Sequence, residues 1–177
     1  KKSLQIFHSI WQPSHDFKFK LAVIILASAS NARKRLLEQA SIPHEVMISG
    51  VEESDFEEDS PKKLVQALAI AKAKAIAKKI EKEQFKNSSI RLINGILGCD
   101  SVFSFQGEIF GKPRDSQQAI DRWKKMSTNS GFLLTGHALI CRPSIVDFKR
   151  NKFFGKIIHN VISTRVEFAE LTDKEIE

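Results

Sequence analysis

Lys72 is the residue whose position most strongly indicates chemistry. At about 100° per residue, it falls near the centre of the apolar face of a predicted helix over residues 61–83. A buried ammonium group without a partner is unfavourable, so a lysine at this place needs an anion or a route to solvent. Lysine can also extend along a neighbouring helix to reach water. The central position favours a functional cation over this simpler explanation.

Asp100 interrupts an apolar segment over residues 90–105 that otherwise has the composition of a β-strand. Aspartate is depleted in strands, so it either marks a turn or bulge bonded to its own backbone or presents a carboxylate from a sheet. Such a carboxylate could hold a divalent cation or orient a water molecule. Taken alone, Asp100 leaves both interpretations open.

A third signal is the turn that follows the first apolar segment. A strand predicted over residues 23–27 leads through Ser28 and Ser30 into a helix over residues 32–40. The first N–H groups of such a helix can bind phosphate, and Arg33 adds positive charge beside them. An ordinary helix cap with solvated basic residues would give the same pattern, and the turn by itself favours that explanation.

Two further residues have weaker signals. Lys112 stands between a glycine and a proline, where it could bind phosphate, although the segment lacks the glycine spacing and the hydroxyl residue of a P-loop. Glu53 belongs to an acidic stretch over residues 52–59, most of which should be solvated. The five histidines have no zinc-binding spacing, and no motif for a covalent nucleophile is present.

The segments that must position these residues alternate between strands and helices, which predicts an α/β or α+β domain. The expected domain covers residues 23–177, after an N-terminal extension over residues 1–22 that has no interpretable pattern. The strands are predicted at residues 23–27, 45–48, 90–105, 108–110, 132–141 and 157–168, and the helices at 32–40, 61–83 and 116–126. Leu36, Leu37 and Ala40 are expected to form the inner side of the first helix.

Composition limits the class of partner and the compartment. The formal charge of +7 favours a polyanion, which could be nucleic acid, an anionic membrane or a small phosphorylated substrate. Two cysteines, far apart in the sequence, predict a reducing compartment such as the cytoplasm. No apolar run approaches the length of a transmembrane helix, so no membrane partner is expected.

The order of these motifs along the chain resembles the Maf family. The matching blocks are LASAS with Arg33, GVEE, LA followed by KAKA, LGCDS, GKPRD and TG, which begin at residues 26, 50, 68, 97, 111 and 135. The resemblance implies an inosine-triphosphatase-like α/β fold with a long, bent, mixed β-sheet flanked by helices. The family continues beyond the position of residue 177, so it also implies a fold incomplete at the C-terminus.

The same resemblance implies an activity: hydrolysis of nucleoside triphosphates to the monophosphate and pyrophosphate, aided by Mg or Mn. It also implies a possible homodimer and no stable nucleic-acid complex. The implied roles are phosphate binding by Ser28, Ser30, Arg33, Lys72 and Lys112, and metal binding and water activation by Glu53 and Asp100, with Asp100 the favoured general base. The alternatives are a catalytically impaired member that binds nucleotides or a partner protein, and a general nucleic-acid binder.

Overall fold

The computed structural model describes residues 23–84, 93–141 and 155–176. The predicted N-terminal extension, the first residues of the segment over residues 90–105, and the connection over residues 142–154 lie outside these ranges. No helix in the described ranges is long and apolar enough to cross a membrane.

The described residues form the predicted strands and helices in the predicted order, together with two short helices. They are β1 (Val23–Ala27), α1 (Asn31–Gln39), β2 (His44–Val46), η1 (Glu53–Asp55), α2 (Pro61–Gln84), β3 (Ile93–Phe105), β4 (Glu108–Phe110), α3 (Ser116–Met126), β5 (Ser130–Cys141), β6 (Ile157–Glu167) and α5 (Asp173–Ile176). The strand predicted over residues 45–48 ends early, at Val46. The carbonyl groups of Ile48 and Ser49 instead accept hydrogen bonds from Lys79, both at 3.0 Å.

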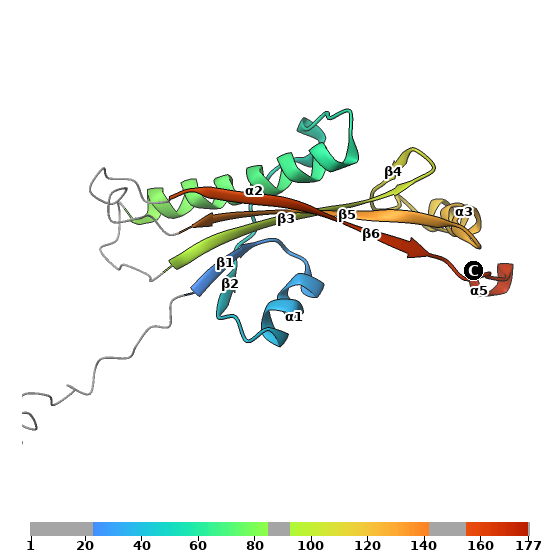
Figure 1. Cartoon of the computed structure of the whole chain (residues 1–177), viewed down its shortest axis with the longest axis horizontal. Coiled ribbons are helices and arrows are strands. Elements are labelled where there is room, and N and C mark those ends of the chain that lie inside the picture. The colour runs from blue at the N-terminus through green and yellow to red at the C-terminus, as the bar shows by residue number, and fades with distance from the viewer. Residues whose placement is uncertain (1–22, 85–92, 142–154, 177) are drawn as a thin grey trace, which may run out of the picture.

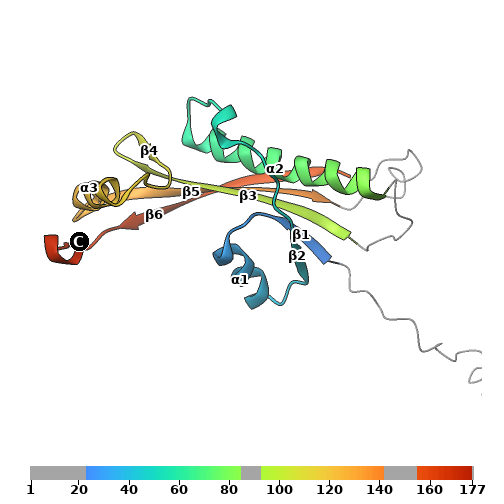
Figure 2. The same cartoon turned by 180° about the vertical axis from the view of Figure 1, so that it is seen from behind.

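The strands form one mixed sheet in the order β2-β1-β3-β5-β6, with β4 paired to β3. β1 is parallel to β2 and β3, whereas β3, β5 and β6 pair antiparallel. Figures 1 and 2 show α2 along one face of the sheet and α1 on the opposite side, while β4, α3 and α5 gather at the far end of the long strands. The predicted α/β fold with a mixed sheet flanked by helices is confirmed.

β3 runs without interruption through Gly98 and Asp100, so of the two interpretations of Asp100 the structure has the carboxylate presented from a sheet. The ladder between β3 and β5 extends on both sides of the pair Asp100 and Gly136. An aspartate is tolerated there because its backbone keeps its place in the ladder, while its carboxylate contacts Lys72 across the face of the sheet.

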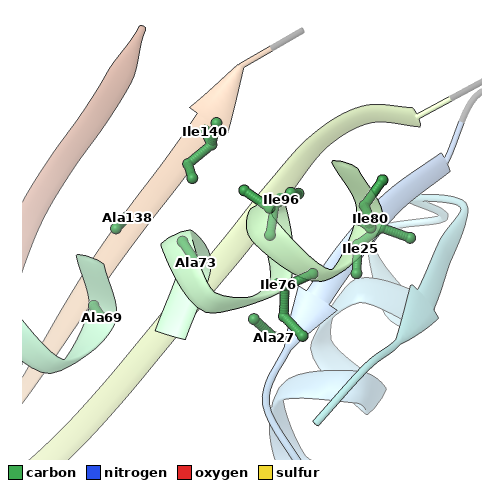
Figure 3. Packing of buried hydrophobic residues seen from close by; sticks show 10 residues of the cluster. Ile25, Ala27, Ala69, Ala73, Ile76, Ile80, Ile96, Ala138 and Ile140 are labelled. Atoms are coloured by element: carbon green, nitrogen blue, oxygen red, sulfur yellow. The ribbon is translucent and has the colours of Figure 1, made fainter. Parts of the chain in front are cut away.

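The core lies between α2 and the sheet, and Figure 3 shows the side chains that fill it. Its buried members are Ile25, Ala27, Ala69, Ala73, Ile76, Ala77, Ile80, Ile96, Ala138 and Ile140. The alanines of α2 let the helix lie close to the strands. Gly98 and Gly136 allow the same approach from the sheet, since a Cβ atom at either would stand 2.1 Å from a carbonyl oxygen of α2.

The leucine side of α1 is not packed against the rest of the described structure as predicted. No residue of this helix is buried, and Leu36 is 63% exposed, so the expected inner side over Leu36, Leu37 and Ala40 is wrong. Polar contacts in the first turn hold the helix instead. Ser30 caps it by accepting a hydrogen bond from the backbone N–H of Arg33, and the Arg33 side chain reaches β3.

β3 and β4, the strands predicted on either side of residues 106–107, form a hairpin. Gln106 and Gly107 both have positive φ, at 48° and 85°, which is the backbone of the tight turns that suit the twist of paired strands. α3 begins after Asp115, whose carboxylate accepts a 2.7 Å hydrogen bond from the N–H of Gln118. These two features bracket the segment that carries Lys112.

Candidate functional site

The site lies where β1 ends and β3 continues. Ala27 at the end of β1 pairs with Gly98, and β3 extends beyond it to Phe105. After β1 the chain enters α1, and after β2 it passes through η1 to α2 on the opposite face of the sheet (Figures 1 and 2). In open α/β sheets, ligands bind outside the carboxyl ends of parallel strands where the connections diverge in this way.

Three of the predicted site residues meet on the α2 face. The Lys72 Nζ atom lies 2.6 Å from Oδ1 of Asp100 and 2.8 Å from Oε1 of Glu53. The side chains of Lys72 and Asp100 are 12% and 8% exposed, whereas that of Glu53 is 64% exposed. The anion that Lys72 was expected to need is therefore present, and the trio opens to solvent on its Glu53 side.

Lys72 keeps its positive charge at neutral pH. Burial by itself lowers the pKa of Lys72, but the hydrogen bonds to Asp100 and Glu53 and the attraction of their charges raise it by more. The net direction is upward from the ordinary value. A permanently charged ammonium group here can neutralise an anion, and it is unsuited to act as a general base.

A second cluster, the Arg33 group, lies beside the end of β1 and consists of Arg33, Ser28, Ser101 and Thr135. Nη1 donates to Oγ of Ser28 at 2.8 Å and to the carbonyl oxygen of Cys99 at 3.2 Å, and Nη2 donates to Oγ of Ser101 at 2.7 Å. The hydroxyl groups of Ser101 and Thr135 lie 2.9 Å apart across neighbouring strands. The guanidinium thus lies beside the backbone of the residue that precedes Asp100.

Ser101 and Thr135 were not predicted as site residues. Hydroxyl side chains occur widely on exposed strands, so nothing local in the sequence distinguishes these two. The register of the sheet brings them together, because Ser101 pairs directly with Thr135 in the ladder between β3 and β5. Their proximity to Arg33 depends on contacts between residues more than 60 positions apart in the chain.

Two other reactive side chains lie next to the Arg33 group, opposite each other in the ladder of β3 and β5. Burial raises the pKa of the Cys99 thiol, which favours the unreactive protonated form. Burial and the nearby Arg33 charge lower the pKa of His137, so its imidazole is neutral at pH 7. A raised pKa disfavours a thiolate nucleophile at Cys99.

Lys112 is not brought into contact with the other predicted residues. It is exposed in the connection from β4 to α3, and in the described parts of the chain it forms no hydrogen bond or ion pair with Asp100 or Lys72. β4 runs antiparallel to β3 and ends at Phe110 opposite Phe103, so the chain leaves the hairpin in the direction of Asp100. Its phosphate-binding role stays a prediction.

An open pocket of about 270 Å³ lies elsewhere, between β4 and α3. It is lined by Glu108, Ile109, Phe110, Gln118, Asp121, Arg122 and Lys125. None of the predicted site residues lines this pocket. The Arg122 guanidinium also covers the Phe110 ring at 4.8 Å, which leaves less of that ring free to stack on a ligand.

Glu53 and Asp100 are the residues that could hold a divalent cation. Within the described ranges, no group of three or more histidine, cysteine, aspartate and glutamate side chains forms a ready-made metal site. Mg²⁺ commonly needs less, since it binds to one or two carboxylates together with water and the phosphates of a substrate. Two carboxylates that converge on one cationic atom fit that kind of shared site.

Comparison with known proteins agrees with the resemblance in the sequence. The family profile described as Maf-like protein matches residues 23–177. A nucleoside triphosphate pyrophosphatase of Parasynechococcus marenigrum (strain WH8102) is 46% identical over 155 residues, covering 88% of this chain and 70% of the relative. One from Synechococcus sp. (strain CC9311) is 47% identical, with 88% and 75% covered. The chain therefore belongs to the Maf-like protein family.

Proposed function

We propose that this protein hydrolyses nucleoside triphosphates to the nucleoside monophosphate and pyrophosphate. The observation that carries the proposal is the meeting of Lys72 with Asp100 and Glu53 beside the end of β1, with Arg33 bound to Cys99 and Ser101, the neighbours of Asp100 in the same strand. Such an arrangement joins cations for a phosphate chain with carboxylates for a metal or a water molecule. The relatives named nucleoside triphosphate pyrophosphatase support the same reaction.

The proposed division of roles follows from charge and exposure. Arg33 and Lys72 neutralise the phosphate chain, because transfer at phosphorus depends chiefly on positioning and charge stabilisation. Ser28 and Ser30 orient the first turn of α1, whose N–H groups lie at the helix end that favours anions. Lys112 adds a further cation from the exposed loop after β4.

The carboxylates act on the attacking water and on the metal. Asp100 accepts the proton of the water as general base, while Glu53, which is largely exposed, helps to hold the cation. A bound Mg or Mn ion would neutralise phosphate charge and polarise the bond that breaks. We propose that attack occurs at the α-phosphorus, so that pyrophosphate is the leaving group.

Product identity tests this proposal directly. The purified protein, incubated with each nucleoside triphosphate and Mg or Mn, should release pyrophosphate and the monophosphate in equal amounts. Chromatography of the nucleotide, together with a coupled assay for pyrophosphate, measures both products. Formation of the diphosphate and inorganic phosphate would instead assign cleavage to the other anhydride bond and contradict the proposal.

Ser101 provides a second test, because its hydroxyl group positions Arg33. Ser101→Ala removes the 2.7 Å hydrogen bond to Nη2 and leaves the Thr135 hydroxyl without this partner. Loss of a hydrogen bond to a charged group is expected to raise KM for the triphosphate about tenfold, with a smaller effect on kcat. Steady-state kinetics measures both constants. Ser101→Thr keeps the hydroxyl and should retain most of the affinity; equal loss in both variants would contradict the positioning role.

We also propose that the protein is cytoplasmic and forms a homodimer. Cys99 and Cys141 are free thiols, which supports the cytoplasm as a reducing setting. The homodimer implied by the family can be tested by light scattering coupled to size-exclusion chromatography. A mass near twice that of the 20.0 kDa chain would support it.

A further inference from the structure

The Lys72 ammonium group occupies the place of a cation between two carboxylates. Its Nζ atom is within hydrogen-bond distance of Asp100 and Glu53 at once, at 2.6 and 2.8 Å. Both are short, charge-assisted contacts. The trio carries a formal charge of −1 with Lys72 in place and −2 without it, so the lysine serves as a counter-ion for the pair.

The side chain of Lys72 can move while the backbone that carries it stays in place. The helix that carries it is held against β3 and β5 by backbone contacts at Gly98 and Gly136, which leave no room for even a Cβ atom. The lysine stem, in contrast, has four rotatable carbons. The exposed side of Glu53 leaves the trio open to a solute. A cation or a phosphate arriving from solvent therefore meets a movable ammonium group on a fixed platform.

We propose that Lys72 is an internal counter-cation that competes with a divalent metal ion for Glu53 and Asp100, and that nucleotide phosphate draws it away. The inference rests on the proposed function and deepens it by giving an order to binding. Without nucleotide, Lys72 keeps the metal affinity low. With nucleotide, the ammonium group pairs with phosphate and the two carboxylates become available to the metal.

The test measures Mn²⁺ binding in the absence of nucleotide. At pH 8, the free Mn²⁺ signal in electron paramagnetic resonance gives the dissociation constant for the wild type and for Lys72→Met. Removing one positive charge next to a divalent ion should tighten Mn²⁺ binding about tenfold or more. Lys74→Met makes the same change of charge at an exposed position of the same helix, and its Mn²⁺ affinity should equal that of the wild type.

Two further variants assign the gain to this site. The double variant Lys72→Met, Glu53→Gln should lose the added affinity, because one of the two carboxylates is gone. Lys72→Gln removes the charge but keeps a hydrogen-bond donor, so it repeats the test if Lys72→Met lowers the melting temperature. Folded variants that bind Mn²⁺ no more tightly than the wild type would overturn the inference.

The Mn²⁺-binding test is independent of the proposed reaction, since it requires no turnover of nucleotide. Tighter Mn²⁺ binding in a protein that cleaves no triphosphate would support the counter-cation and contradict only the reaction. Unchanged Mn²⁺ binding in a protein that releases pyrophosphate would overturn the counter-cation and leave the reaction in place.

Discussion

Asp100→Asn is expected to lower kcat for triphosphate cleavage by about 10²–10⁴-fold, the range typical of a lost general base. Asparagine has nearly the same shape and can still accept the hydrogen bond from Lys72, so the fold should persist. What it lacks is the ability to take a proton from water and the charge to bind a metal. Release of pyrophosphate at saturating nucleotide measures the effect.

A matched control separates this effect from a general change of charge. Glu58→Gln removes one carboxylate from an exposed position of the acidic stretch, where no catalytic role is proposed. Its kcat should equal that of the wild type. If Asp100→Asn keeps more than about a tenth of the activity, the general-base role assigned to Asp100 is wrong.

Gly98→Ala is expected to give a large loss of stability. The added Cβ atom would stand 2.1 Å from the carbonyl oxygen of Ala69 and 2.8 Å from the nitrogen of Ala73. Both are backbone atoms in the middle of α2, so the helix as a whole must move away from the sheet. Overpacking of this kind costs about 3 kcal/mol, which lowers the melting temperature by roughly 6–12 °C.

The same displacement should weaken catalysis, because Lys72 lies one residue before Ala73 and would move away from Asp100. Circular dichroism during heating measures the melting temperature. Steady-state kinetics below the melting transition measures the loss of catalytic activity. Gly111→Ala is the control, since a Cβ atom there meets nothing within 4 Å. A Gly98→Ala variant that melts with the wild type would show that α2 is not held as closely as described.

Local patterns in the sequence account for most of the elements. The strand over residues 23–27, the helix that begins at Pro61 and the strands on either side of residues 106–107 each depend on neighbours within one strand, turn or cap, and the structure confirms them. The same kind of pattern marks Lys72 as a cation on an apolar face. The order of short motifs was also enough to indicate the Maf family, which the comparisons show.

The packing of α1 could not be predicted in this way. Leucine spacing indicates an inner side, but whether a second surface covers it depends on where the helix lies relative to the sheet. The structure holds α1 through polar contacts of its first turn and leaves Leu36 exposed. Asp100 is a similar case, because its ladder partner and its ionic partner both come from distant segments.

By itself, the sequence determined which elements form, because caps, turns and helical periodicity act over a few residues, and it identified Lys72 as a charge in need of an anion. Only the tertiary structure decided that this anion is the pair Asp100 and Glu53. It also decided that Arg33 reaches Ser101, at a separation of 68 positions. The physical reason is that such contacts depend on sheet register and on the close approach of α2, which are set by packing between distant parts of the chain.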